Sequence, residues 1–443
     1  METKKRCISD EENDAETYAS DMSDKRGSIH SDRNHTNENI ATLERQDDVR
    51  TGSPSPDSIQ QESPKSKKHR SLYDESTVGH VTELWGRLLT LQNCLLNMPY
   101  AEGMKTLKNF NSLDELLSLG GQNLIHELVN DNIKIKNMID SCGSFLTTSG
   151  NCKSLNYFTQ PVIGVVYGPT GCGKSQLLRN ILSMQLLTPP PETVFFITPN
   201  VDMMPPQELA AWETQICEGN YVPGDNNTII PQSGALMPKF IKMSYSELTE
   251  DRNYDVTNPN NVFANAAAKG PIAIILDECM EDLGNHKGVA KFFHAFPSKL
   301  HDKFPRCTGY AVLVVLHNMN PRRDQGGNIS NLKIQSKLHI ISPKMQPSQL
   351  NRFINLYTKG LPLPISLLLK DIFNHYRTSG KFDWIIYNTT PENEALQWLF
   401  MNPEEGLMPM YLNVQSYLFK ILEKISKVIS NRARWTRYYR SKK

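Results

Sequence analysis

The sequence predicts an α/β fold in which a mostly parallel sheet is covered by helices, preceded by a small helical region and a disordered N-terminal segment. Three observations support this fold class. Short apolar runs alternate with helical stretches over residues 157–400. Apolar residues recur at helical spacing over residues 71–156, and residues 1–70 contain almost no aliphatic clusters. A chain of 443 residues is long enough for two or three such units.

Residues 1–70 form a polar leader that is rich in Ser, Asp, Glu, Asn and Lys. Such a segment buries too little apolar surface to offset its ordering entropy, so we expect it to be disordered. It ends in the basic run PKSKKHR at residues 64–70. This run fits a nuclear-import signal and fits a solvated stretch of charge equally well.

The helical region at residues 71–156 is predicted from the spacing of its apolar residues. One stretch is apolar at every third or fourth position, and these positions form a single stripe: Val81, Leu84, Leu88, Leu91 and Leu95. Residues 113–129 continue this pattern. Since such stripes belong to a core more often than to a partner surface, we expect these helices to pack together.

The part of the chain at residues 157–400 contains four runs that read as buried strands. They cover residues 162–168, 193–199, 272–278 and 310–317. Strands that are apolar on both faces and alternate with helices are typical of a parallel sheet covered on each side. We expect the polar stretch 220–260 to be an insertion or a long loop. Two helices are predicted after residue 343, followed by a strand at residues 382–388.

Residues 401–443 combine an amphipathic helix, expected over about 409–430, with a basic and aromatic tail. The candidate DNA-binding residues of the tail are Arg432, Arg434, Trp435, Arg437, Tyr438, Tyr439, Arg440, Lys442 and Lys443. Cations neutralise phosphates and aromatic rings stack on bases, so we expect this tail to contact nucleic acid. A nuclear-localisation tail or a solubility tail would have the same composition.

Composition narrows the class of protein further. The eight cysteines form no CxxC pair and have no zinc-ligand spacing with histidine, so we expect reduced thiols in a cytosolic or nuclear compartment. No apolar run approaches the roughly 20 residues that a membrane span needs, and the N-terminus has no signal-peptide core. We therefore expect a soluble intracellular protein without a membrane partner.

The segment GPTGCGKS at residues 168–175 matches the phosphate-binding pattern GxxxxGK[ST] in full. An apolar strand precedes it, and a helix is expected over residues 176–187. Backbone amides of such a turn cradle phosphates, and the helix N-terminus adds its dipole. We expect Lys174 to reach the β- and γ-phosphates and Ser175 to bind Mg²⁺. The candidate ATP-binding residues are Gly168, Pro169, Thr170, Gly171, Cys172, Gly173, Lys174 and Ser175.

Two carboxylates, Asp277 and Glu278, end the third apolar run. Ligands bind at the carboxyl ends of strands in open α/β sheets. We expect Asp277 to hold Mg²⁺, through water or together with Ser175, and Glu278 to activate the water that attacks the γ-phosphate. The alternative is an acidic strand end that caps a helix.

The fourth apolar run ends in His317 and Asn318. A polar side chain at this strand tip can contact the γ-phosphate or the attacking water, and Asn318 is our candidate for this sensor role. Ordinary loop polarity is the alternative. Three arginines are candidates for a finger that acts on the ATP of a neighbouring subunit, and the sequence does not distinguish them: Arg322, Arg323 and Arg352.

Taken together, the strand–GPTGCGKS–helix unit, the IAIILDE strand, the HNMNPRRD segment and the Arg/Tyr-rich terminus resemble the adenovirus family of genome-packaging ATPases. The resemblance covers nearly everything after residue 71. It implies an ATP- and Mg²⁺-dependent protein of the host nucleus and the virion. It also implies binding to the packaging sequence and late-promoter elements of viral double-stranded DNA, late transcriptional activation, other viral packaging proteins as partners, and self-association as a dimer or higher oligomer.

Two other functions fit parts of the sequence. A nucleotide-gated, DNA-binding transcription or assembly factor with negligible turnover would share the phosphate loop and the tail, but Glu278 counts against it. A P-loop kinase for a small substrate would explain the phosphate loop, but not the leader or the tail. We therefore expect a P-loop ATPase coupled to double-stranded DNA.

Overall fold

The computed structural model describes most of the chain from Tyr73 onward. The described residues are 73–98, 113–143, 146–149, 152–155, 158–217, 221–223, 229–231, 238–279, 283, 296–304, 309–319, 329–379, 382–402 and 406–442. The predicted leader at residues 1–70 and its basic run lie outside them.

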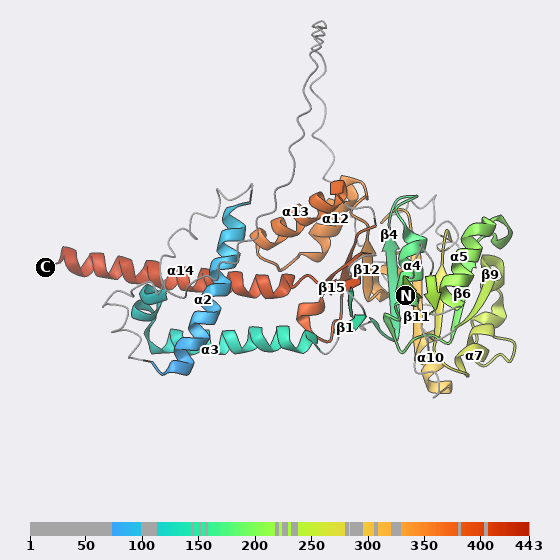
Figure 1. Cartoon of the computed structure of the whole chain (residues 1–443), viewed down its shortest axis with the longest axis horizontal. Coiled ribbons are helices and arrows are strands. Elements are labelled where there is room, and N and C mark those ends of the chain that lie inside the picture. The colour runs from blue at the N-terminus through green and yellow to red at the C-terminus, as the bar shows by residue number, and fades with distance from the viewer. Residues whose placement is uncertain are drawn as a thin grey trace, which may run out of the picture. The chain divides into compact units, whose positions relative to one another are not determined.

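A nine-stranded sheet is the largest sheet of the described residues, with strand order β15-β14-β13-β12-β4-β11-β10-β6-β9 (Figure 1). Its strands are β4 (Val162–Tyr167), β6 (Thr193–Thr198), β9 (Lys239–Ser244), β10 (Ile272–Leu276), β11 (Tyr310–Leu316), β12 (Leu338–Ile341), β13 (Trp384–Asn388), β14 (Trp398–Asn402) and β15 (Gly406–Pro409). Neighbours from β12 to β9 pair in parallel, whereas β13, β14 and β15 extend the sheet in antiparallel pairs. The predicted α/β class with a mostly parallel sheet is confirmed.

The four predicted strands form the middle of this sheet. Every residue of β4, β6, β10 and β11 is buried, as is typical of strands that are covered on both faces. The strand that precedes the phosphate loop, β4, lies between β12 and β11. The loop therefore leaves the sheet close to its centre.

Helices connect the strands and cover the sheet. They are α4 (Lys174–Ser183), α5 (Pro206–Cys217), α6 (Tyr245–Leu248), α7 (Val262–Ala267), α10 (Phe296–Lys303), α11 (Ser330–Gln335), α12 (Pro347–Tyr357) and α13 (Leu363–Ser379). Short two-stranded pairs form between β3 (Phe158–Thr159) and β5 (Leu187–Thr188) and between β7 (Tyr221–Pro223) and β8 (Ile229–Pro231). The two helices predicted after residue 343 are confirmed as α12 and α13.

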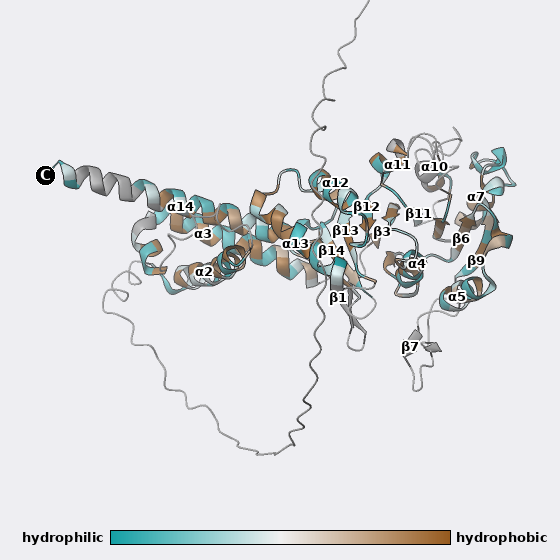
Figure 2. Cartoon of the chain, turned by 90° about the horizontal axis from the view of Figure 1, so that it is seen from above, coloured by the Kyte–Doolittle hydropathy of each residue, from teal (hydrophilic) through white to brown (hydrophobic). Residues whose placement is uncertain are grey.

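A helical layer joins residues from the two ends of the described chain. It consists of α2 (Glu75–Leu96), α3 (Leu113–Cys142) and α14 (Leu412–Ser441), and α14 packs on both of the others. The predicted stripe of α2 is buried in this layer, so its prediction as core is confirmed. Tyr417 Oη of α14 donates a 2.7 Å hydrogen bond to Asp131 of α3. Figure 2 shows hydrophobic and hydrophilic residues on different sides of α3 and α14.

The structure corrects our predictions for two segments. The stretch 220–260 was predicted as a loop or insertion, but it contains β9, which forms the edge of the main sheet beside β6. Its exposed lysines hide the strand pattern, because edge strands carry charge on their open side. The basic tail was predicted to follow a helix ending near residue 430, but α14 continues to Ser441. Residues 412–441 contain neither Gly nor Pro, so nothing in them interrupts the helix.

Three element boundaries also differ from prediction. The helix after the phosphate loop runs from Lys174 to Ser183, rather than over residues 176–187. The boundary drawn between residues 400 and 401 cuts through β14. The region 71–156 ends in a hairpin of β1 (Leu146–Ser149) and β2 (Cys152–Leu155). Among the described helices, none has both the length and the apolar character needed to cross a bilayer.

Candidate nucleotide site

The phosphate loop is tied to the sheet at its start and runs directly into α4 at its end. The Gly168 backbone N–H donates to Leu316 O of β11 at 3.1 Å, which ties the start of the loop to the neighbouring strand. Gly171 and Gly173 have φ angles of 76° and 89°, a region that residues with a Cβ rarely adopt. Gly173 caps α4 without a side-chain hydrogen bond, so the first N–H groups of the helix lack a capping side chain. This is the arrangement that binds phosphate oxygens.

Lys174, the first residue of α4, is only 9% exposed. Its ammonium donates to Pro169 O at 2.9 Å and lies 3.4 Å from His317 Nδ1. Burial and the positive charge of Lys174 lower the pKa of His317, so the imidazole is neutral at pH 7 and Nδ1 accepts a hydrogen bond from Lys174. The lysine thus spans from the phosphate loop to the tip of β11.

Asp277 lies directly after β10 and is 8% exposed. Burial, with a further contribution from the negative charge of Glu278, raises the pKa of Asp277 to about 6. The positive charge of Lys174 acts in the opposite direction. A cation at this carboxylate would therefore stabilise its charged form.

Glu278 is exposed, and its backbone has a φ angle of 56°. This left-handed conformation is uncommon for a residue with a Cβ and is found disproportionately at functional sites. The Glu278 backbone N–H donates to Asp277 Oδ1 at 3.1 Å. The chain therefore turns sharply after β10, with one carboxylate buried at the strand end and the next one open to solvent.

The strand order brings the phosphate loop, His317 and the two carboxylates together where the parallel strands end. β11 lies between β4 and β10, and the three strands are parallel. Their carboxyl ends carry the phosphate loop, His317 and the carboxylate pair, respectively. Two strand spacings, about 10 Å, separate the tips of β4 and β10. A polyphosphate bound at Lys174 is within reach of the carboxyl ends of both β11 and β10.

The structure places His317, and not Asn318, against the phosphate-loop lysine. Asn318 Oδ1 accepts a 2.7 Å hydrogen bond from Gln349 Nε2 of α12, and Gln349 Oε1 accepts from the Met319 N–H at 3.1 Å. The sensor role of Asn318 stays a prediction, and His317 is a site residue that we did not single out. The position of His317 directly after β11, next to Asn318, could have indicated it.

The structure describes some of the remaining predicted site residues and leaves others outside the described ranges. Ser175 is partly buried in the first turn of α4, and Arg352 is exposed on α12. Arg322 and Arg323 lie outside the described residues. In the basic segment, residues 432–439 belong to α14, Arg440 and Lys442 are exposed, and Lys443 lies outside the described residues.

The donor set fits Mg²⁺. Asp277 and Ser175 offer hard oxygen ligands. Burial raises the pKa of the Asp277 carboxyl, and a bound cation would lower that pKa by stabilising the carboxylate. Among the described residues, no cluster of three or more His, Cys, Asp or Glu side chains is placed to hold a metal. An ion at this edge would therefore take its other ligands from phosphate and water, as Mg²⁺ commonly does.

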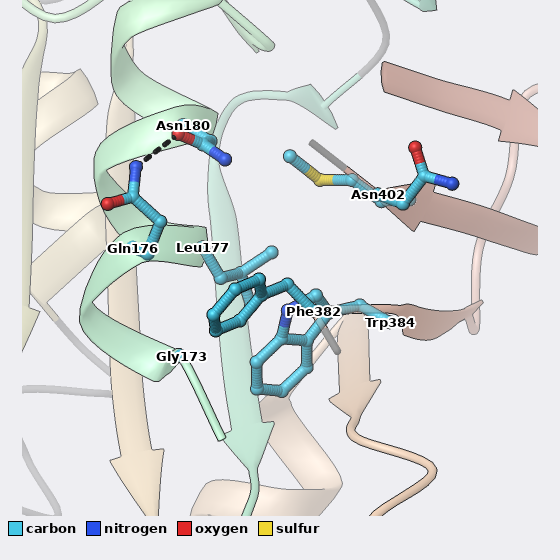
Figure 3. Close-up of a pocket in the computed structure, with 8 residues that line it drawn as sticks. Gly173, Gln176, Leu177, Asn180, Phe382, Trp384 and Asn402 are labelled. Carbon is cyan, nitrogen blue, oxygen red and sulfur yellow. Dashed lines mark hydrogen bonds between the residues drawn. The ribbon is translucent and has the colours of Figure 1, made fainter. Parts of the chain in front are cut away.

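A second group of side chains lies at the same sheet edge, on the other side of β4. Because β13 runs antiparallel to β12, its first residue, Trp384, lies where the parallel strands end. Phe382 precedes it. The hollow in Figure 3 is lined by Gly173, Gln176, Leu177, Asn180, Phe382, Trp384, Met401 and Asn402. We did not predict this group, because about 210 residues separate the Phe382 ring from the glycine that it contacts.

Solved structures show a limited likeness. The genome-packaging NTPase B204 of Sulfolobus turreted icosahedral virus 2, in complex with ATP-gammaS, is 12% identical, with a TM-score of 0.30, and the match covers 55% of this chain and 97% of that one. The ATPase EscN of the enteropathogenic E. coli type III secretion system matches with 9% identity and a TM-score of 0.24, over 62% of this chain and 69% of that one. Overlaps of this size support no conclusion about function.

Sequence relatives are much closer. The protein called Packaging protein 1 is 61% identical in human adenovirus B serotype 7, over 100% of both chains. In human adenovirus A serotype 12 it is 62% identical, over 96% of this chain and 94% of that one. In canine adenovirus serotype 2 it is 61% identical, over 94% of both. The family model of the adenovirus IVa2 protein matches residues 73–443. The chain therefore belongs to the adenovirus IVa2 protein family.

Proposed function

We propose that the chain binds ATP with Mg²⁺ at residues 168–175, hydrolyses it, and couples hydrolysis to the packaging of viral double-stranded DNA. One observation carries the enzymatic part: the phosphate loop with Lys174, His317 and the Asp277–Glu278 pair follow three adjacent parallel strands at the same end of the sheet. The relatives named Packaging protein 1, which are 61–62% identical, support the packaging part.

In this proposal the ammonium of Lys174 exchanges its contacts with Pro169 and His317 for the β- and γ-phosphates. Asp277 and Ser175 hold Mg²⁺, which neutralises charge on the phosphates. The exposed Glu278 carboxylate accepts a proton from the attacking water. His317, neutral and beside Lys174, donates a hydrogen bond from its Nε2–H to an oxygen of the γ-phosphate.

The DNA part of the proposal rests on the basic C-terminal half of α14. Six cationic side chains lie between Arg432 and Lys443, a segment without acids. Phosphate contacts by such residues release counterions and give affinity that falls steeply with salt. The partners are the packaging sequence and late-promoter elements of the viral genome, other viral packaging proteins and further copies of the chain. The proposed location is the host nucleus and the virion, and the proposal includes a role in late transcription.

Steady-state ATP hydrolysis by the full-length protein, with and without double-stranded DNA, tests the proposal. We expect turnover that DNA stimulates. Glu278→Gln should retain ATP binding and lose turnover, whereas Lys174→Ala should lose binding. Glu75→Gln, at an exposed position of α2, is the matched control and should behave as wild type.

Two outcomes contradict parts of this proposal. Normal hydrolysis by Glu278→Gln would show that another group activates the water. Background turnover by the wild-type protein on bound DNA, together with tight ATP binding, would instead favour a nucleotide-gated DNA-binding factor.

A further inference from the structure

We propose that Gln349 of α12 is a positioning residue for ATP hydrolysis. It holds the amide of Asn318 so that Asn318 Nδ2, and not Oδ1, faces the γ-phosphate of bound ATP. This assignment rests on the proposed function, since it concerns the same site. It adds Asn318 to the groups that donate to the γ-phosphate, and it gives α12 a part in turnover.

The Gln349 side chain holds the segment that follows β11 at two points. Gln349 Oε1 accepts a 3.1 Å hydrogen bond from the backbone N–H of Met319, and Gln349 Nε2 donates to Asn318 Oδ1 at 2.7 Å. The Met319 side chain is 2% exposed, so packing also fixes the backbone next to Asn318. Gln349 therefore fixes both the chain around Asn318 and the amide of Asn318 itself.

A backbone N–H can only donate, and this fixes the orientation of both carboxamides in turn. The atom of Gln349 that meets the Met319 N–H must be an acceptor, which is Oε1. The other polar atom of Gln349 is then the donor Nε2, so the Asn318 atom that meets it must be the acceptor Oδ1. The second polar atom of Asn318 is the donor Nδ2. An N–H of this kind is what a phosphate oxygen accepts from.

Asn318 lies where a donor to the γ-phosphate is needed. It is partly exposed at the carboxyl end of β11 and directly follows His317, whose Nδ1 lies 3.4 Å from Lys174 Nζ. This strand lies between β4, which leads into the phosphate loop, and β10, which leads into the carboxylate pair. The carboxyl end of β11 therefore borders a γ-phosphate that is held by Lys174.

Packing holds α12 against the same end of the sheet. The helix begins shortly after β12, at Pro347, and the Gln349 backbone N–H donates to Gln346 O at 2.9 Å in its first turn. The fully buried Phe353 packs edge-on against the ring of Tyr167, the last residue of β4 before the phosphate loop. A side chain on a packed helix positions its partner more precisely than one on a loop.

Steady-state ATP hydrolysis by full-length variants, in the presence of double-stranded DNA, tests this assignment. In Gln349→Glu the carboxylate still accepts from the Met319 N–H but has no proton to donate to Asn318. The Asn318 amide then turns over, so that Nδ2 donates to the carboxylate and Oδ1 faces the γ-phosphate. We expect kcat to fall about 100- to 1,000-fold, as for the loss of one donor to a developing negative charge. The KM for ATP should change far less than kcat.

Other variants show whether Gln349 acts through Asn318. Gln349→Ala removes the bond to Asn318 without turning the amide over, so kcat should fall only about 2- to 13-fold, the factor that corresponds to one ordinary hydrogen bond. Asn318→Ala removes the donor and should lower kcat as far as Gln349→Glu does. In an Asn318→Ala background, neither change at Gln349 should lower kcat further. The matched control is Asn351→Asp, an amide-to-carboxylate change at an exposed position of α12, which should behave as wild type.

Asn318→Asp keeps the assignment testable if the variants at Gln349 do not fold. The aspartate still accepts from Gln349 Nε2, so its melting temperature should stay close to that of the wild type. It offers no donor to the γ-phosphate, so kcat should fall as far as in Asn318→Ala.

Several results overturn the assignment while the proposed function stands. These are a wild-type kcat in Gln349→Glu, in Asn318→Ala or in Asn318→Asp, and an Asn318→Ala background in which Gln349→Glu still lowers kcat. A purely structural role of Gln349 predicts this last result, because lost stability lowers kcat whichever side chain follows His317. Absence of turnover by the wild-type protein would instead remove the proposed function, and this assignment with it.

Discussion

Replacing Gly168 by alanine tests how closely the phosphate loop is packed. A Cβ at this position would lie 2.4 Å from Cys172 Sγ, 3.3 Å from Lys174 Cγ and 3.3 Å from Trp384 Cη2. Ordinary van der Waals contact begins at 3.4 Å, so the sulfur would have to retreat by about 1.0 Å (3.4 − 2.4). Cys172 is itself buried, at 3% exposure. Overpacking of such a site costs about 1–3 kcal/mol of unfolding free energy.

Thermal unfolding of the ligand-free protein measures this cost. The loop lies in a unit of about 380 residues, for which 1 kcal/mol corresponds to about 1.2 °C, so Gly168→Ala should lower the melting temperature by about 1–4 °C. Cys172→Ala removes the sulfur, so the double variant should recover most of that loss. Gly86→Ala in α2 is the matched control: its Cβ meets nothing within 4 Å, and alanine favours the helix by about 0.5–1 kcal/mol. A wild-type melting temperature for Gly168→Ala, or no rescue by Cys172→Ala, would refute the packing argument.

Two further predictions concern the metal ligand and the basic segment. The pKa of Asp277 is raised to about 6, so the Mg²⁺-dependent affinity for ATP should fall as pH drops through 6. Asp277→Asn should lose this pH dependence. A wild-type protein whose ATP affinity stays constant between pH 8 and pH 5 would contradict the assignment of Asp277 as a metal ligand. Since that pKa lies above the ordinary 3.8, the ligand-free protein gains stability from this group as pH falls through 6, and Asp277→Asn should melt higher than wild type at pH 7. Deleting residues 432–443 should weaken binding to double-stranded DNA in fluorescence anisotropy and flatten the plot of log affinity against log salt; an unchanged slope would rule out phosphate contacts by this segment.

The middle of the sheet was predictable because burial on both faces leaves a continuous apolar run. The strands β4, β6, β10 and β11 have this signature, and all four were found from it. The strand β9 was missed because exposed lysines interrupt its pattern at the sheet edge. The strand β12 is only four residues long, too short to stand out from its surroundings. Apolar pattern thus predicts strands that are both covered on both faces and long enough to form a continuous run; β12 is fully buried but too short.

Some residues of the candidate site could be predicted from the local sequence, whereas others come together only through contacts between distant parts of the chain. The residues 168–175 are contiguous, so their spacing alone predicted a phosphate loop on the end of a strand. The contact between Lys174 and His317, and the approach of Phe382 to Gly173, join residues far apart in the chain. Such contacts depend on which strand lies beside which. Local spacing carries no information about strand order, and therefore these partners required the structure.

The helical layer has a consequence for the order in which the chain folds. Its helices α2 and α3 leave the ribosome early, but α14, which covers them, begins about 270 residues after α3 ends. At about 5–20 residues per second, synthesis of that interval takes roughly 15–55 s. During this time the faces that pack against α14, including the Asp131 partner of Tyr417, have no cover from it. The N-terminal helices therefore stay open to aggregation and to chaperone binding until the last helix is made.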